Sequence, residues 1–390
     1  MKVVIVIPTY NENGNIERLI NILEEEIFPK IKGYDMNILV VDDSSPDGTA
    51  DTVRNLSKKY KNVHLLMNKR KQGLGAAYIQ GMTEAIKTLK PDIFFEMDAD
   101  LSHDPKKIPD FLKKIEEGSD MVVGSRYIKG GSIPENWGIH RKLFSVLGNL
   151  MVKVILMRFW HHDWTTGYRA LKVKVFEDLK SELVEFKGYT FQVSSLHKAI
   201  AKGFKVSEVP FHFTDRTLGK SKIAPREYIF DLLRYVITAR ARELYHSPFM
   251  KYALTGFVGY VINAVSLEAF STWFNFHPLP AAAASAELSI IWNFVVNNFW
   301  AFGQHKITHP VKIILKFPQF NLVSLGSLVI ISTIVFLATH LFGNTTIVRQ
   351  IALVIAIGFF VIPYSYSMYN IFIWKRWHIS SISKLQEKLG

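Results

Sequence analysis

The sequence predicts an α/β domain with a mainly parallel sheet, followed by a membrane region made of helices. Up to about residue 247, short apolar runs alternate with amphipathic helical patterns. This alternation is typical of strands that helices bury on both faces. Between Lys251 and Trp374 only seven charged residues remain, and they interrupt long apolar stretches. A soluble head followed by a membrane region accounts for both patterns.

The head alternates strands and helices in chain order. We expect strands at residues 3–7, 37–41, 63–67, 93–97 and 121–124. We expect helices between them, at residues 15–28, 50–59, 75–87 and 105–116. Ligands of such folds bind at the carboxyl ends of the parallel strands, so we look there for functional residues.

Polar residues gather at those strand ends. Tyr10 and Glu12 follow the first expected strand, Asp43 lies in the turn after the second, and Asp98 and Asp100 follow the fourth. An aromatic ring can stack on a base, a carboxylate can accept a ring N–H, and paired carboxylates can hold a hard divalent cation against a diphosphate. Each motif alone is also compatible with a solvated turn or a helix cap. Their coincidence at one edge predicts a nucleotide-sugar pocket.

The composition excludes several other classes of function. The net charge is +13, but no nucleic-acid-binding motif accompanies it, and the cations gather beside the apolar region. Attraction to anionic lipid and to a phosphorylated substrate explains this charge better. Cysteine is absent, which excludes disulfides and thiol chemistry. The apolar run at residues 3–7 is too short for a secretory signal, so we expect the C-terminal helices to direct membrane insertion.

The motifs at residues 8–12, 41–49, 73–78, 97–103 and 124–127 together resemble family 2 glycosyltransferases of GT-A fold, specifically dolichyl-phosphate mannose synthases. The resemblance covers about the first 245 residues. It implies a Rossmann-like GT-A catalytic domain at residues 1–224. It also implies transfer of mannose from GDP-mannose to dolichyl phosphate with inversion, which gives dolichyl β-D-mannosyl phosphate for protein or lipid glycosylation.

The same resemblance implies roles for individual residues on the donor side. The nucleoside would be held by Pro8, Tyr10, Glu12, Val41 and Asp43. Asp98 and Asp100, with Ala99 between them, would bind Mg²⁺ or Mn²⁺ and the sugar diphosphate. Several relatives carry Gln as a further metal ligand where this chain has Ser102, so Ser102 or a water molecule would complete the metal shell. Arg216 and Lys222 would neutralise the leaving diphosphate.

The acceptor of this family is a polyprenyl phosphate, which is already anionic at neutral pH and therefore needs positioning more than deprotonation. Arg126 and Arg141 are the expected forked donors, with surface solubility as the alternative for each. Residues 163–169 and 188–192, including Gln192, match the family and are expected to line the sugar side. Trp164 and Tyr168 are equally compatible with core aromatics.

Two amphipathic patterns predict helices that lie in the headgroup plane, at about residues 141–160 and 225–246. Packing of both helices on the sheet is the alternative. Four apolar segments follow and are long enough to span a bilayer, at about 251–274, 281–302, 320–342 and 347–374. The region 247–378, and its segment 251–302 most clearly, resembles the four-helix GtrA-like membrane domains.

The charges of the connections predict the orientation of the multi-pass protein. The connection 303–318 and the tail 379–390 are basic, whereas the connections near His277 and Asn344 carry almost no charge. The positive-inside bias therefore places the head and the C-terminus in the cytoplasm. We also expect Glu268, Glu287 and Arg349 to cluster at the outer ends of the helices.

Three alternative functions remain open from the sequence. A transferase of the same fold would use UDP-glucose or another nucleotide-sugar with a polyprenyl phosphate. A processive synthase is less compatible, because no Gln-x-x-Arg-Trp motif is evident. A polyprenyl-lipid flippase or transporter with a degenerate head is the most distant alternative. The sequence does not determine the oligomeric state.

Overall fold

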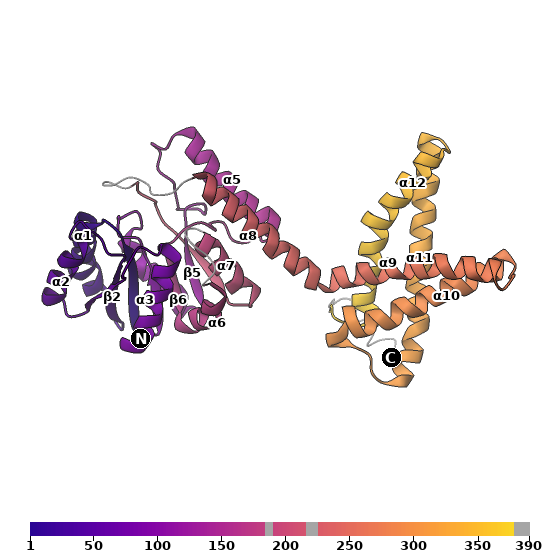
Figure 1. The fold of residues 1–390 in the computed structure, drawn as a ribbon, viewed down its shortest axis with the longest axis horizontal. Helices are drawn as coiled ribbons and strands as arrows, with labels where there is room; N and C mark the ends of the chain where they lie inside the picture. Colours follow the sequence, from indigo (N-terminus) through magenta and orange to yellow (C-terminus); the bar gives the residue numbers. More distant parts are fainter. Residues whose placement is uncertain (184–189, 216–224, 378–390) are drawn as a thin grey trace. The chain divides into compact units, whose positions relative to one another are not determined.

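The computed structural model describes residues 1–183, 190–215 and 225–377 (Figure 1). The chain forms two compact units, Met1–Arg240 and Ala241–Gly390. The division falls close to the point where the frequent charges of the first half give way to apolar stretches. The predicted order of an α/β head and a helical region is therefore confirmed.

The head is built on a seven-stranded sheet with the order β3-β2-β1-β4-β6-β5-β7. The strands are β1 (Lys2–Thr9), β2 (Asp35–Asp42), β3 (Val63–Met67), β4 (Ile93–Glu96), β5 (Met121–Ser125), β6 (Arg169–Lys172) and β7 (Val206–Pro210). Only β6 runs antiparallel to its neighbours, so the predicted mainly parallel sheet is confirmed. The five expected strands correspond to β1 to β5. The sequence pattern does not signal β6 and β7, because both are short and mix charged with apolar residues.

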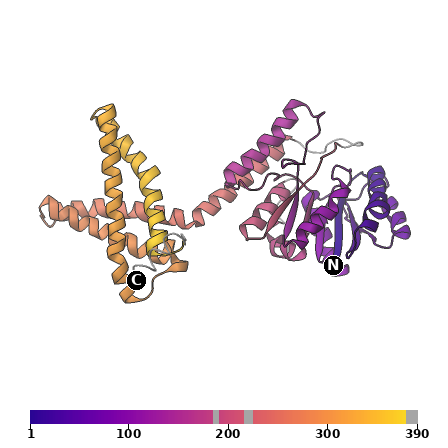
Figure 2. The same ribbon diagram turned by 180° about the vertical axis from the view of Figure 1, so that it is seen from behind.

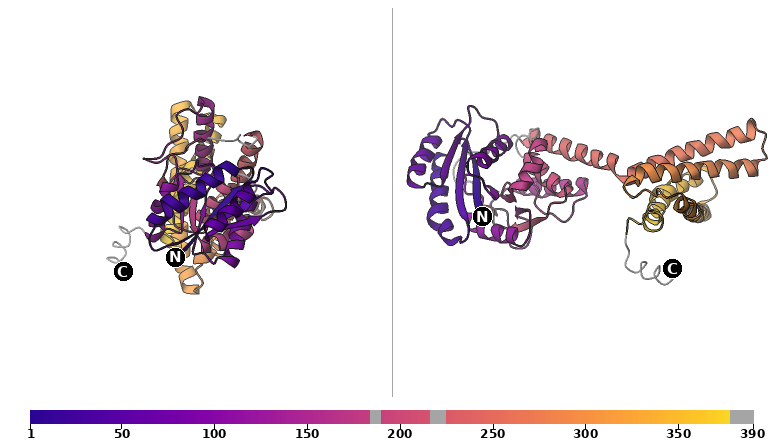
Figure 3. Two further views of the ribbon diagram at one scale, coloured as in Figure 1. Left: turned by 90° about the vertical axis from the view of Figure 1, so that its left-hand side faces the viewer. Right: turned by 90° about the horizontal axis from the view of Figure 1, so that it is seen from below.

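Helices cover both faces of this sheet (Figures 1 and 3). One face carries α1 (Asn13–Ile22), α2 (Thr49–Lys59) and α4 (Ile108–Glu116). The other carries α3 (Leu74–Thr88), α6 (Val173–Leu183) and α7 (Thr190–Ala201). Alternate side chains of β1 enter the two cores, Val3 and Ile5 on one face and Val4 and Val6 on the other. Burial on both faces explains why the strands read as continuous apolar runs.

Two further helices, α5 (Ile139–Leu156) and α8 (Pro225–His246), lie side by side (Figures 1 and 2). On α5 the polar stripe faces the head, with Asn149 only 3% exposed, while Phe144 and Leu147 are 64% and 54% exposed. This arrangement suits a helix whose apolar face meets lipid. On α8, Val236 is buried in the core although Phe230 is exposed. Part of α8 thus packs on the head, which agrees with the alternative to a helix lying in the headgroup plane.

The second unit has, within the described residues, four helical segments long and apolar enough to cross a membrane. They are α9 (Pro248–Thr272), α10 (Pro278–Val296, continued to Ala301), α11 (Pro310–Phe342) and α12 (Thr346–Ile355, continued through α13, Ile362–Met368, to Ile373). The hairpin of α9 and α10 crosses the hairpin of α11 and α12 (Figures 1 and 3). Phe302, after α10, stacks on Trp374, after α13, with ring centroids 4.2 Å apart.

The structure corrects two details of the membrane region. The third helix begins at Pro310 rather than near residue 320, so Lys312 and Lys316 lie in α11 and not in a loop. Pro318 does not end this helix, because neighbouring groups can satisfy a carbonyl freed by proline in a membrane helix. Arg349 donates to Asn344 and Thr346 of its own turn, rather than to the predicted Glu268 and Glu287.

Candidate active site

Asp98 and Asp100 lie just beyond the carboxyl end of β4, as predicted. Asp100 is 4% exposed and accepts the backbone N–H of Ser102 at 3.1 Å, whereas the Asp98 side chain is 27% exposed. Leu101, directly after Asp100, adopts a left-handed φ of 62°, which turns the chain as it leaves the aspartates. The buried ring of His103 accepts the Asp98 N–H at its Nδ1 and places Nε2 3.8 Å from the Asp98 carboxylate. His103 thus positions Asp98.

The donor chemistry of this turn fits the expected cation. Carboxylate oxygens are the ligands that Mg²⁺ and Mn²⁺ prefer, and Asp98 and Asp100 supply them on one turn. Among the described residues, no three or more Asp, Glu or His side chains come together as a metal-binding group. The two aspartates would therefore be supplemented by Ser102, substrate phosphate oxygens or water.

A buried polar cluster lies directly behind the aspartates. Glu96 and Arg169 are 1% and 0% exposed and face each other as register partners on β4 and β6. Arg169 donates to the Thr166 carbonyl at 3.1 Å and to Ser195 Oγ at 3.0 Å, so it fixes the loop before β6. Burial raises the pKa of Glu96 to about 7, although the nearby Arg169 charge opposes this shift.

The raised pKa of Glu96 predicts how the stability of the head depends on pH. Between pH 4.5 and 7 the folded chain keeps a proton on Glu96 that the unfolded chain releases. This contribution to the free energy of unfolding is therefore complete below pH 4.5 and falls by ~3 kcal/mol as the pH rises to 7. Glu96→Gln should flatten the dependence, as measured by urea unfolding at pH 5 and pH 7. Glu17→Gln, on the exposed face of α1, is the control; identical slopes for wild type and Glu96→Gln would contradict the prediction.

Gly167 brings the sugar-side loop close to Asp98. A Cβ at this position would lie 3.3 Å from Gln192 Nε2 and 3.8 Å from Asp98 Oδ1. Gln192 is 0% exposed, and its amide lies near enough to Glu96 to lower the pKa of that carboxyl, but within the described part of the chain it makes no hydrogen bond of good geometry. A buried amide in this state is costly unless a ligand satisfies it. The structure thus brings Gln192 beside the aspartates, where the sequence places the sugar.

Asp43 uses most of its hydrogen-bonding capacity within the protein. Its Oδ2 accepts the backbone N–H groups of Gln72 and Gly73 at 3.0 and 3.2 Å, and its Oδ1 accepts the Asn68 amide at 2.8 Å. A carboxylate offers about four acceptor positions, so one remains for the predicted contact with a base. In this structure Asp43 mainly stabilises the loop 68–73 through these three hydrogen bonds.

The other predicted nucleoside contacts share this end of the sheet. Pro8 and Val41 are register partners on β1 and β2, and Tyr10 and Glu12 follow β1 directly. The Tyr10 ring lies 4.3 Å beneath Lys71 Nζ, so the loop that Asp43 holds also covers Tyr10. The structure brings these residues together as predicted, and a base stacking on this face of Tyr10 would displace the Lys71 ammonium.

Each arginine predicted to grip the acceptor binds a carboxylate of the protein. Arg126 donates to both oxygens of Asp163 at 2.6 and 2.7 Å, and the two side chains are 8% and 0% exposed. Arg141 donates to both oxygens of Asp215 at 3.0 and 3.2 Å and is 47% exposed. Arg126 is therefore a buried, fixed charge, and the surface alternative does not hold for it. Arg216 and Lys222 lie outside the described residues.

Sequence reasoning missed the roles of several neighbouring groups. Trp164 and Tyr168 are both 0% exposed, which favours the core alternative for them. His103, which stacks on Tyr168 with ring centroids 4.9 Å apart, positions Asp98, and the buried Glu96 ends β4 two residues before Asp98. A glutamate inside the apolar run of β4 was the available signal for Glu96. No local signal identifies Asp163 and Asp215 as partners of Arg126 and Arg141, because these contacts span 37 and 74 residues.

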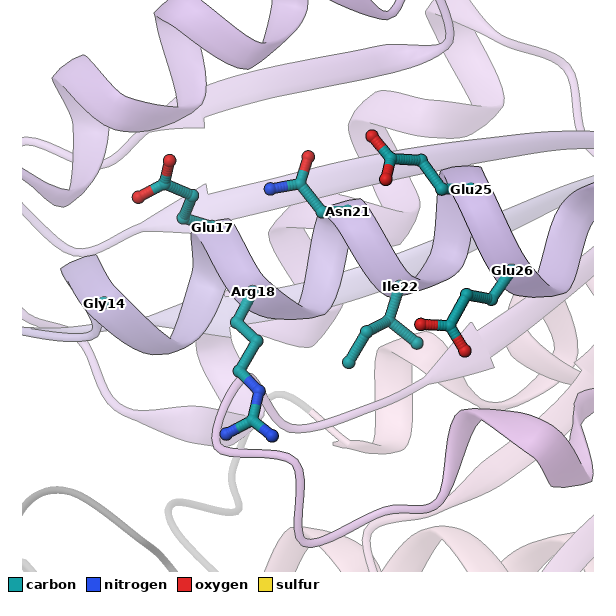
Figure 4. Close-up of a pocket in the computed structure, with 7 residues that line it drawn as sticks. All are labelled: Gly14, Glu17, Arg18, Asn21, Ile22, Glu25 and Glu26. Carbon is teal, nitrogen blue, oxygen red and sulfur yellow. The ribbon is translucent and has the colours of Figure 1, made fainter.

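A shallow groove lies along the outer face of α1 and the helical turn that follows it (Figure 4). Its lining is mostly polar and comprises Gly14, Glu17, Arg18, Asn21, Ile22, Glu25 and Glu26. All of these residues come from one stretch of helix, and the aspartates at the end of β4 are not among them. We assign no part of the chemistry to this groove.

Comparison with known proteins adds two family matches. Residues 4–180 match Glycosyl transferase family 2, and residues 251–374 match the GtrA/DPMS transmembrane domain. A dolichol-phosphate mannosyltransferase of Pyrococcus furiosus is 32% identical over 364 residues, which cover 92% of this chain and 96% of that protein. A polyprenol monophosphomannose synthase of Mycolicibacterium smegmatis is 36% identical over 61% of this chain and 88% of its own length.

A solved structure is also similar, though distantly. Glucosyl-3-phosphoglycerate synthase from Mycobacterium tuberculosis, in complex with Mn²⁺, uridine diphosphate and glucosyl-3-phosphoglycerate, is 16% identical. The match covers 61% of this chain and 79% of that chain, with a TM-score of 0.44. At this distance no residue role is transferred from it.

Proposed function

The chain belongs to glycosyl transferase family 2 and carries a GtrA/DPMS transmembrane domain, and from this premise we propose that it is a metal-dependent, inverting mannosyltransferase. The donor is GDP-mannose, the acceptor is dolichyl phosphate, and the product is dolichyl β-D-mannosyl phosphate. The similarity to the Pyrococcus furiosus protein carries this proposal, because it spans the head and the membrane region together. Both curated relatives described above are named for mannose transfer, so the UDP-glucose alternative is not favoured.

The reaction we propose is a single displacement at the anomeric carbon. An oxygen of the acceptor phosphate forms the new bond to this carbon while the bond to the GDP oxygen breaks. The electron pair leaves with GDP, and the configuration inverts. The phosphate is anionic at neutral pH, so the head needs no strong general base, and its task is to align the two substrates.

The expected site residues would divide this task between the donor side and the acceptor side of the site. Asp98 and Asp100 would hold a cation that neutralises the departing diphosphate, with Arg216 and Lys222 as further cations. Gln192 would satisfy its buried amide with sugar hydroxyls beside Gly167. Arg126, which Asp163 holds in place, would attract the acceptor phosphate by its positive charge.

We propose that the head faces the cytoplasm. Lys306 follows α10, Lys312 and Lys316 lie in the first turns of α11, and Lys375 and Arg376 follow the last span. These cations all belong to the ends of helices that would share one side of the membrane with the head after four crossings. Protease accessibility of the head in sealed, right-side-out vesicles would overturn this orientation.

The direct test is a comparison of donors in membranes that contain the protein. Labelled GDP-mannose with dolichyl phosphate should give labelled lipid, whereas labelled UDP-glucose should give none. EDTA should abolish the labelling, and excess Mg²⁺ or Mn²⁺ should restore it. Labelling from UDP-glucose alone would overturn the mannose assignment, and full activity in EDTA would overturn the metal. Membranes lacking the protein provide the background.

A further inference from the structure

Three hydrogen-bond donors converge on one carboxylate just before and within the first turn of α5. Arg141 donates from Nη1 and Nη2 to the two oxygens of Asp215, and the indole Nε1 of Trp137 donates to Oδ2 at 3.2 Å. The guanidinium lies over the indole, with Cζ 3.9 Å from the ring centroid. This contact holds the fork in one plane. A planar fork that binds two carboxylate oxygens also matches two oxygens of a phosphate.

The surroundings of these donors suit a phosphate that carries an apolar chain. Trp137 is 8% exposed, whereas Ile139 and Phe144, on the first turns of α5, are 78% and 64% exposed. The backbone N–H groups at the start of this 18-residue helix add a favourable field for an anion. A lipid phosphate bound here would place its chain along the exposed apolar face of α5.

The two arginine pairs of the head differ in how readily they can exchange partners. Arg126 and Asp163 are almost fully buried, so separating them would remove the attraction that offsets the desolvation of both charges. Arg141 and Asp215 are 47% and 34% exposed, so water can replace either partner at little cost. A phosphate monoester carries more negative charge than a carboxylate and accepts more hydrogen bonds. It can therefore displace Asp215 from Arg141, but not Asp163 from Arg126.

Arg141 is already expected from the sequence to grip the acceptor phosphate; we infer that the Trp137 indole N–H joins it in a clamp, and that Asp215 occupies this clamp until the acceptor displaces it. The inference rests on the proposed function for the identity of the acceptor. It adds the indole N–H of Trp137 as a direct phosphate ligand. It also makes Asp215 a competitor of the acceptor, so that loss of its charge should improve acceptor binding.

Kinetics of single substitutions in the full chain test the clamp. Trp137→Phe keeps the ring beneath Arg141 but removes its N–H, and should raise the KM for dolichyl phosphate about ten-fold. Asp215→Asn should lower this KM about two- to five-fold, because it removes the competing charge. The KM for GDP-mannose should stay unchanged in both variants. Trp160→Phe, at an indole that is 88% exposed, is the matched control and should change neither constant.

A rise in the acceptor KM of Asp215→Asn would show that Asp215 positions Arg141 instead of competing for it, and would overturn that part of the inference. An unchanged acceptor KM in Trp137→Phe would remove the indole from the clamp. Both outcomes are judged from a change in the KM for dolichyl phosphate while the KM for GDP-mannose stays constant. A general loss of folding would not produce this difference.

Binding without a donor separates failure of the clamp from failure of the proposed function. Calorimetric titration of the purified full chain with farnesyl phosphate should show weaker binding for Trp137→Phe and tighter binding for Asp215→Asn. If these changes appear but no mannose is transferred, the clamp stands and the proposed function falls. If mannose is transferred but binding ignores both substitutions, the clamp falls. Inorganic phosphate should bind more weakly than farnesyl phosphate, and equal affinity would overturn the lipid as the ligand.

Discussion

Asp100→Ala is expected to lower mannosyl transfer about a thousand-fold or more while the head remains folded. The reason is the position of Asp100 just beyond the end of β4, where it is 4% exposed and accepts the Ser102 N–H beside Asp98. Removing it takes a ligand from the cation that neutralises the leaving diphosphate, and a loss of ~4 kcal/mol of transition-state stabilisation corresponds to this factor. The measurement is the initial rate of label transfer from GDP-mannose to lipid at saturating substrates.

Asp110→Ala is the matched control for this substitution. Asp110 is a carboxylate of the same head and lies on α4 with its side chain 53% exposed; among the described residues its one ion pair is with Lys107, just before that helix. It should keep nearly full activity. Circular dichroism of both variants checks that the head is folded. If Asp100→Ala retained more than about a tenth of the wild-type rate, the aspartate would not be a ligand of an essential cation. A lipid transporter with a degenerate head would also survive the substitution.

The edge of the sheet that carries the site could be predicted from the sequence because its signals are local. Each strand from β1 to β5 is a short apolar run followed by its helix, and Tyr10, Asp43 and Asp98 come directly after such runs. Parallel strands bring these ends together without further information. The structure confirms this juxtaposition of strand ends, because β1 pairs with both β2 and β4.

The partners of the charged residues could not be predicted in the same way. Glu96 meets Arg169 because β6 lies antiparallel between β4 and β5. The sequence pattern does not predict β6. Likewise, the sequence gives Arg126 and Arg141 the same expected role, binding of the acceptor phosphate. Their exposure separates them, since Arg126 is buried against Asp163 while Arg141 is half exposed on Trp137. Burial depends on the whole fold and has no local signature.

Asp163→Ala is expected to destabilise the head by about 3–5 kcal/mol, the largest effect on stability among the substitutions considered. The carboxylate is 0% exposed and accepts hydrogen bonds from Nε and Nη2 of Arg126, so its removal takes these two bonds and their negative charge away from a buried guanidinium. The same carboxylate accepts the Thr165 N–H and Thr165 is also bound by Arg126, so the sugar-side loop should loosen as well. Urea unfolding of the purified chain in detergent measures the loss.

Two further variants show whether burial is the cause. Arg141→Ala breaks the exposed pair with Asp215 and should cost less than ~1 kcal/mol. The double substitution Arg126→Met with Asp163→Leu removes both buried charges and should recover most of the stability lost in Asp163→Ala, although it removes the acceptor-side cation. Equal losses for Asp163→Ala and Arg141→Ala would contradict the distinction between a fixed and an exchangeable arginine. Because Arg141 is exposed and Arg126 is buried, a phosphate can replace the protein carboxylate bound to Arg141 but not the one bound to Arg126.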